Sequence, residues 1–198
     1  MATDSLSAAL PTIRSSFLNQ ENDPARAALR TGNRHSADGW EAVLKPAVAR
    51  YQESTQGIAF RGDAAFAEPE MYDYLESEGI EYTIRLPVNQ ILQAETAHVL
   101  WRPVGRPAHY VQRVHKSFRH KAASWSRPRR VVAKVEWHPG ERFPRVGFIV
   151  TNLRCKSTNV VTFYNKRGTC EQWMIEWERT SKGRRLSCSS FDANAVRL

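Results

Sequence analysis

The stretch FRGDAAFAEPEMYDYLESEGIEYTIRLP, residues 60–87, carries the strongest fold signal in this chain. Residues 58–62, IAFRG, predict a short apolar strand that ends at the Gly62–Asp63 step. Residues 68–80 then have apolar side chains at helical spacing, with a Pro in the first turn and a Gly near the end. Residues 81–87 alternate polar and apolar side chains as a strand does. A strand, a helix and a strand in this order predict a parallel crossover and an α/β fold.

Helical patterns lie on both sides of this stretch. Residues 35–52 have apolar side chains at helical spacing, with Ser36 as a candidate N-cap, and predict a helix that Pro46 kinks or shortens. Residues 88–100 predict another helix. Residues 1–34 are mixed and polar, with turn formers and a Pro, so we expect at most one short helix in them.

After residue 100 the pattern changes to the alternation that is typical of strands. VVAKVEW, HPGERFPR and VGFIVTN, residues 131–152, predict the strand, turn and strand of an antiparallel hairpin. A helical pattern returns over residues 160–180. We therefore expect four segments: an irregular start (1–26), the first part of an α/β core (27–100), a basic β-rich insertion (101–153), and a core helix with a basic tail (154–198).

The chain is basic, and its excess charge is concentrated in one segment. Its 198 residues contain 29 Lys and Arg against 20 Asp and Glu, which gives a net charge of +9. Residues 101–135 hold ten basic residues and no acidic one. Such a segment can neutralise phosphates, so we expect nucleic acid as the partner. The alternative is a soluble protein that is basic without a polyanionic partner.

The insertion supplies the candidate phosphate-binding side chains, which are Arg113, Lys116, Arg119, Lys121, Arg129 and Arg130. Four aromatic residues are interleaved with them: Trp101, Tyr110, Phe118 and Trp125. Aromatic faces can stack on unpaired bases, but burial in a β-rich core is the commoner role, and we expect it for these residues.

Other classes of site find little support in the sequence. The three cysteines form no CxxC pair and the six histidines lack zinc-finger spacing, so we expect neither a disulfide framework nor a structural zinc. We see no secretion signal at the start, and no apolar run approaches the roughly 20 residues of a membrane span. We therefore expect a cytoplasmic protein, with no membrane partner, that is associated with the nucleoid when it binds DNA.

Two acidic residues stand out by their positions. Asp63 follows the end of a strand, and Glu171 lies within the helical pattern of residues 160–180. A site for two Mg²⁺ ions roughly 4 Å apart needs carboxylates from different elements, so that one ion activates the attacking group and the other stabilises the leaving oxygen. The alternative is that both are ordinary surface acids without a catalytic role.

YNKRGTCEQWMIEWE, residues 164–178, resembles the Tyr-x2-Arg-x3-Glu-x6-Lys signature of bacterial insertion-sequence transposases with a DDE catalytic domain. Residues 60–87 resemble that family's segment around its second catalytic Asp, and residues 30–40 resemble the stretch just upstream. The resemblance implies a partial ribonuclease-H-like fold, with a β-rich insertion between the second Asp and the Glu helix. It also implies Mg²⁺-dependent cutting and joining of DNA at element ends within a synaptic complex.

The same resemblance implies roles for individual residues. Asp63 and Glu171 would be the second and third catalytic acids, and both would be metal ligands. Tyr164 and Arg167 would hold phosphate near the cut site, because a guanidinium fork and a phenol can both donate hydrogen bonds to phosphate oxygens.

Two departures from the family pattern shape the functional prediction. Glu178 stands where the signature has Lys. The Asp residues upstream of Asp63 are Asp4, Asp23 and Asp38, and none of them follows an apolar strand, so we expect the first catalytic Asp to be absent. We therefore predict a transposase fragment, truncated at its N-terminus and its C-terminus, that is a DNA nuclease and strand transferase by ancestry and is inactive alone.

Three alternatives stay open. The chain is also consistent with a non-catalytic DNA-binding remnant, an inhibitor of a full-length transposase, or a decayed gene product. Because a core without its first strand would expose a sheet edge, we expect self-association or binding to a full-length transposase.

Overall fold

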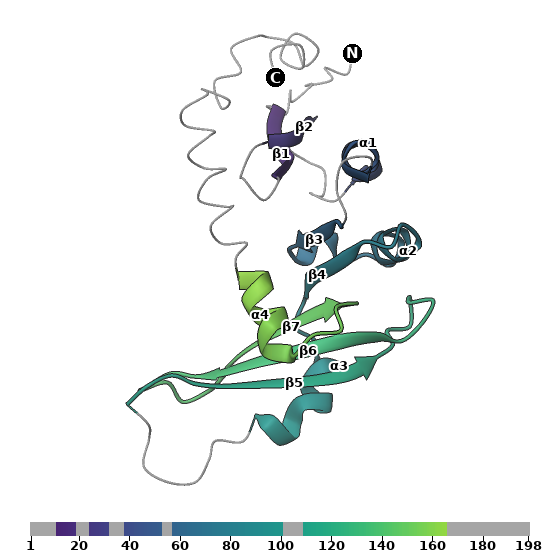
Figure 1. Ribbon diagram of the computed structural model, residues 1–198. Coiled ribbons are helices and arrows are strands. Elements are labelled where there is room, and N and C mark those ends of the chain that lie inside the picture. Colours follow the sequence, from purple (N-terminus) through teal and green to yellow (C-terminus); the bar gives the residue numbers. More distant parts are fainter. Residues whose placement is uncertain (1–10, 19–23, 32–37, 53–56, 101–108, 166–198) are drawn as a thin grey trace, which may run out of the picture. The chain divides into compact units, whose positions relative to one another are not determined.

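The computed structural model describes residues 11–18, 24–31, 38–52, 57–100 and 109–165 (Figure 1). The described residues fall into two compact units, one before residue 57 and one from Gly57 onward. Each unit is described by itself.

The first unit begins with a two-stranded hairpin, β1 (Pro11–Leu18) and β2 (Pro24–Thr31), paired antiparallel. The prediction of an irregular segment with at most one short helix is wrong for these residues. The Ala-rich sequence of β2 favours a helix locally, but strand preference is decided by pairing with a neighbour. Here pairing extends from Pro11 opposite Thr31 to Leu18 opposite Pro24, with two register shifts between them.

Helix α1 (Glu41–Gln52) follows and confirms the helix predicted before the crossover. Trp40 and the helical positions Val43, Leu44, Ala47 and Val48 are buried, which is the stripe that the spacing predicted. Pro46 does not end the helix, which continues past it to Gln52, and Pro46 lies on the exposed side. The proposed N-cap Ser36 lies outside the described residues.

The second unit is a five-stranded sheet in the order β3-β4-β7-β6-β5 (Figure 1). Strand β3 (Ala59–Gly62) runs parallel to β4 (Glu81–Leu86), and α2 (Pro69–Ser77) connects them, so the predicted crossover and α/β fold are confirmed. Gly79, with a φ of 69°, ends the helix as the sequence suggested.

The remaining strands form an antiparallel meander that continues the same sheet. These are β5 (Gln112–His120), β6 (Arg129–Trp137) and β7 (Arg145–Thr151), and β7 pairs antiparallel with β4. The predicted hairpin is therefore β6–β7. Helix α3 (Gln90–Thr96) precedes the meander and α4 (Ser157–Asn165) follows it. The strands of the predicted β-rich segment thus belong to the same sheet as β3 and β4.

The two faces of this sheet have different compositions. One face is apolar and lies against α2, whose Met71, Tyr72 and Leu75 are fully buried; the buried strand residues on this face are Tyr82, Ile84, Val131, Ala133, Val135, Phe148 and Val150. On the other face, Val132 and Ile149 pack against Val160 and Val161 of α4. None of the helices in the described ranges is long and apolar enough to cross a membrane.

Arg129 fastens the meander to α2. Its side chain is only 3% exposed and donates hydrogen bonds to Glu76 and Asp73 of the helix. The guanidinium carbon also lies 5.0 Å from the Tyr72 ring centroid and 5.6 Å from that of Trp125. A charge that is removed from water to this extent needs such partners. Arg129, a predicted phosphate ligand, therefore has an internal structural role.

Glu76 is the most heavily shared acceptor in this network. It accepts hydrogen bonds from Arg129, from the more exposed Arg127, and from the Tyr82 hydroxyl at 2.8 Å. Burial alone would raise the pKa of Glu76, but these hydrogen bonds hold that pKa below its ordinary value. The carboxylate thus stays ionised in the folded protein, as Arg129 requires.

We predict that Arg129→Leu lowers the free energy of unfolding by about 3 kcal/mol, because it leaves the Glu76 charge largely buried with weaker compensation. Urea unfolding followed by circular dichroism measures the change. Arg142→Leu, at an exposed turn position, is the matched control and should change stability by less than about 0.5 kcal/mol. Equal midpoints for the two variants would show that the network contributes nothing net.

Candidate functional site

Asp63 lies directly after the end of β3, at the start of a short 3₁₀ turn, Ala64–Phe66. Its Oδ1 accepts a hydrogen bond from the backbone N–H of Ala65 at 3.1 Å, so the carboxylate caps this turn. The side chain is half-buried. The carboxylate is therefore held in a defined orientation at the carboxyl end of a strand.

Gly62 permits the close packing that precedes Asp63. A Cβ at this position would lie 2.9 Å from Cε1 of Phe60, 3.2 Å from Cβ of Phe66 and 3.4 Å from Cγ1 of Ile84. The rings of Phe60 and Phe66 meet edge-on, with centroids 5.8 Å apart. The absence of a side chain at Gly62 thus sets how the Asp63 turn folds back on β3.

Arg61 connects the Asp63 strand to helix α4. Its Nη1 donates a hydrogen bond to the carbonyl oxygen of Phe163 at 3.2 Å, and its guanidinium carbon lies 5.0 Å from the centroid of the Phe163 ring. Tyr164, the first residue of the predicted Tyr-Arg-Glu signature, is the next residue along the helix. The contact therefore links the strand that precedes Asp63 to the helical turn that carries Tyr164.

The described residues do not by themselves complete a metal site. They contain no group of three His, Cys, Asp or Glu side chains arranged to hold an ion. Of the two predicted metal ligands, Asp63 is described, whereas Glu171 lies outside the described ranges, as does Arg167. One strand-end carboxylate suits Mg²⁺ chemically, but a two-ion site needs further carboxylates from elsewhere.

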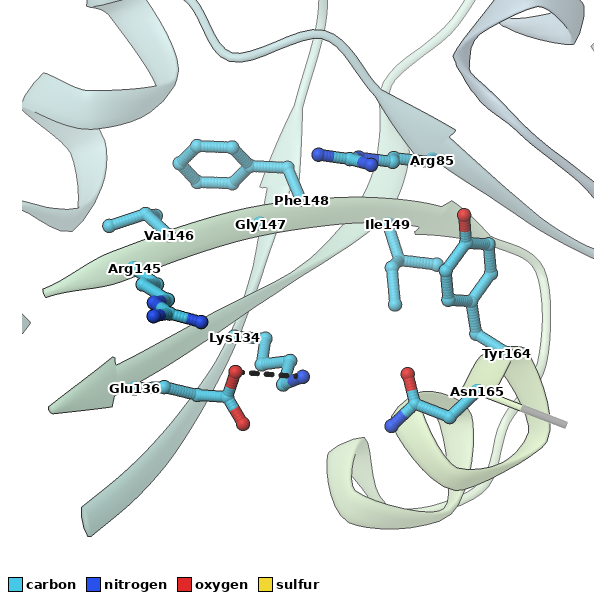
Figure 2. A pocket seen from close by; sticks show the side chains of 10 residues that line it. All are labelled: Arg85, Lys134, Glu136, Arg145, Val146, Gly147, Phe148, Ile149, Tyr164 and Asn165. Atoms are coloured by element: carbon cyan, nitrogen blue, oxygen red, sulfur yellow. Dashed lines mark ion pairs between the residues drawn. The ribbon is translucent and has the colours of Figure 1, made fainter. Parts of the chain in front are cut away.

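Tyr164 lines a cavity of about 290 Å³ on the α4 side of the sheet (Figure 2). Three basic side chains line the same cavity, Arg85 from β4, Lys134 from β6 and Arg145 from β7, together with Asn165 of α4. The Tyr164 ring packs against the apolar cluster between α4 and the sheet. The cavity thus brings cations from three strands together with a phenol and an amide.

The strand register extends this cluster into a larger surface, the basic face, on the α4 side of the sheet. Arg113 lies opposite Glu136, Arg119 opposite Arg130, and Lys134 opposite Gly147. Because side chains on paired positions share a face, six basic residues belong to it: Arg85, Arg113, Arg119, Arg130, Lys134 and Arg145.

Glu136 lies among these cations and offsets part of their charge. It accepts a hydrogen bond from Nε of Arg113 at 2.9 Å and pairs with Nζ of Lys134 at 3.0 Å. Although burial alone would raise the pKa of Glu136, these contacts hold it below its ordinary value. Burial and the neighbouring Lys134 lower the pKa of His115, so that this histidine adds no charge at neutral pH.

The other predicted phosphate ligands have varied surroundings. Arg119 is exposed and donates to the Pro128 carbonyl at 2.9 Å, and Lys116 and Lys121 are exposed too, with Lys116 on the opposite face. Arg130 donates to the carbonyl oxygens of Leu153 and Cys155, so much of its hydrogen-bonding capacity is used within the protein.

Sequence reasoning missed Arg85 and Arg145 as members of this surface. Arg85 lies in EYTIRLP, where the alternation already placed it on the side opposite Ile84 and Leu86. The missing information was the β4–β7 pairing, which sets Arg85 opposite Ile149 and thus beside α4.

One comparison with known proteins identified a family. A protein-family model described as transposase DDE domain group 1 matches residues 15–198. A search of curated proteins returned no match.

We predict that Gly62→Ala lowers the free energy of unfolding by about 1–3 kcal/mol, because the added methyl group overlaps the Phe60 ring and the backbone-attached Cβ of Phe66. Thermal unfolding measures the loss. Gly57→Ala is the control, since a Cβ there meets no atom within 4 Å. If Gly62→Ala were as stable as Gly57→Ala, close packing before Asp63 would not constrain the turn.

Proposed function

The chain belongs to the transposase DDE domain group 1 family, whose chemistry is DNA transposition, and we propose that it binds DNA through the basic face described above. The observation that carries this proposal is the shared cavity of Tyr164, Arg85, Lys134 and Arg145. Tyr164 is the signature residue with a phosphate-binding role by resemblance. Of the three cations around it, Arg85 belongs to β4, before the predicted insertion, whereas Lys134 and Arg145 belong to β6 and β7, within it.

A phosphodiester backbone fits this surface chemically. Guanidinium groups bind phosphate oxygens with two parallel hydrogen bonds, and lysine adds a point charge. The direct contacts we propose are Arg85, Arg113, Arg119, Lys134, Arg145 and Tyr164. Arg167 joins this set by its place in the signature. Lys116, Lys121 and Arg130 add to the positive potential that attracts DNA, and Arg129 is left out because it is buried and paired.

We further propose that Asp63 and Glu171 are ligands of Mg²⁺, consistent with the general use of divalent metal by the family. A bound ion would polarise the phosphate and activate the attacking water or hydroxyl. Asp63 would contribute a carboxylate that is already oriented by the Ala65 N–H. Arg61 would hold the end of β3 against α4 through its hydrogen bond to Phe163.

We propose that this chain alone does not cut DNA. A third carboxylate is needed, and neither β1 nor β2 contains an Asp. Asp38 is exposed in the turn before α1, and Asp4 and Asp23 lie outside the described residues. Binding through the basic face needs no such acids, which favours a second candidate function: occupying element ends, alone or with a full-length transposase, and so inhibiting transposition.

We predict that the chain binds a short duplex with an affinity that falls steeply with salt. The double variant Arg85→Ala/Lys134→Ala removes two phosphate contacts, so the slope of log affinity against log salt should decrease by about two. Fluorescence anisotropy at several salt concentrations gives both slopes. Arg50→Ala, an exposed position on α1, is the control and should leave the slope unchanged. An unchanged slope in the double variant contradicts the proposed surface.

For the metal site, we predict saturable binding of Mg²⁺ or Mn²⁺ that is lost in Asp63→Asn/Glu171→Gln, because carboxylate charge is what these ions require. Isothermal titration calorimetry of the full chain measures it. Asp38→Asn is the matched control and should bind as the parent does. Identical heats for the parent and the double variant would mean that the two acids do not share an ion, without bearing on DNA binding by the basic face.

A further inference from the structure

Two aromatic side chains are exposed at one end of the sheet. Phe143, in the β6–β7 turn, is 80% exposed, and Tyr110, just before β5, is 69% exposed. The register places both at the same end, because Gln112 lies opposite Trp137 and Glu136 lies opposite Arg145. Of the interleaved aromatics that we expected in the core, Trp125 is buried and Phe118 half-buried, so the expectation is wrong for Tyr110.

The turn that carries Phe143 is braced from within. Gly140 adopts a φ of 81°, and the Glu141 N–H donates to the His138 carbonyl at 3.2 Å. Glu141 also pairs with Arg145 across the base of the turn. Pro139 and Pro144 restrict the backbone further. A stiff turn thus presents a large apolar side chain to solvent. Because a preorganised turn loses little conformational entropy on binding, this arrangement favours a binding role for Phe143.

The charges around this tip indicate the kind of partner. Arg142 is exposed beside Phe143. At the same end, Arg113 pairs with Glu136 and Arg145 pairs with Glu141, so cations outnumber acids among these residues by three to two. Exposed aromatic rings with an excess of cations nearby suit a nucleic acid, because cations hold phosphates while rings stack on bases. Because cations are in excess at this tip, two copies of it would carry net charge of the same sign, which opposes self-association there.

We propose that Phe143, supported by Tyr110, is a base-stacking tip that contacts unpaired or unstacked nucleobases while the basic face holds the adjoining backbone. This inference rests on the proposed DNA binding and adds the part of DNA that the tip contacts. Apolar side chains that enter a duplex act at steps where bases are already unstacked or easily separated. The tip therefore favours opened DNA over a perfect duplex.

The test uses a duplex with a small internal bubble that contains 2-aminopurine, and a fully paired duplex of the same length. The parent chain should bind the bubble about tenfold more tightly than the paired duplex and should change the 2-aminopurine fluorescence. Phe143→Ala should abolish both the preference and the fluorescence change, whereas Phe143→Trp should retain them. Tyr110→Ala should weaken both.

Arg142→Ala separates stacking from charge, because it should weaken binding to both duplexes and leave the bubble preference intact. Phe143→Ala with an unaltered preference and fluorescence change overturns the inference, and so does a change in sedimentation that shows the tip to be an interface between copies. In either case the salt dependence of paired-duplex binding still tests the basic face separately. No binding of either duplex by the parent overturns the proposed function itself.

Discussion

The buried contact between Arg129 and the acids of α2 is the constraint on which the rest of the second unit depends. Arg129 opens β6, while Glu76 and Asp73 belong to the crossover helix between β3 and β4. Neither Arg129 nor Glu76 can be buried without a partner, so the meander and the crossover must pack together in one arrangement. That arrangement fixes which face of the sheet is covered by α2 and which remains for α4 and the cations.

The functional surface follows from this division and from the alternation of side chains along strands. Once Arg129 and Val131 point toward α2, Val132 and Lys134 must point the other way. The β4–β7 pairing then sets Arg85 of the crossover unit in the same cavity as Lys134 and Arg145 of the meander. The cavity thus combines cations of the basic segment with Arg85 and Tyr164, which come from outside it.

The sequence predicted those parts whose signals are local. The spacing of apolar residues and the positions of proline and glycine, all within short stretches, predict the β3–α2–β4 crossover and the β6–β7 hairpin. What it missed depends on partners far along the chain. The Ala-rich β2 is a strand because β1 pairs with it, and Arg129 is buried because α2 offers two acids. Tyr110 was expected in the core, yet its position before β5 places it beyond the end of the sheet.

The Arg61 contact has a consequence for how the candidate catalytic residues are positioned. The insertion lies between Asp63 and Tyr164 in the sequence, so its length could have been expected to set their separation. Instead, Arg61 joins β3 directly to Phe163, and α4 packs on Val132 and Ile149 of strands that pair back to β4. The positions of Asp63 and Tyr164 are therefore determined by contacts within the sheet and across β3–α4. The turn that bears Phe143 takes no part in the Arg61–Phe163 contact or in the packing of α4 on Val132 and Ile149.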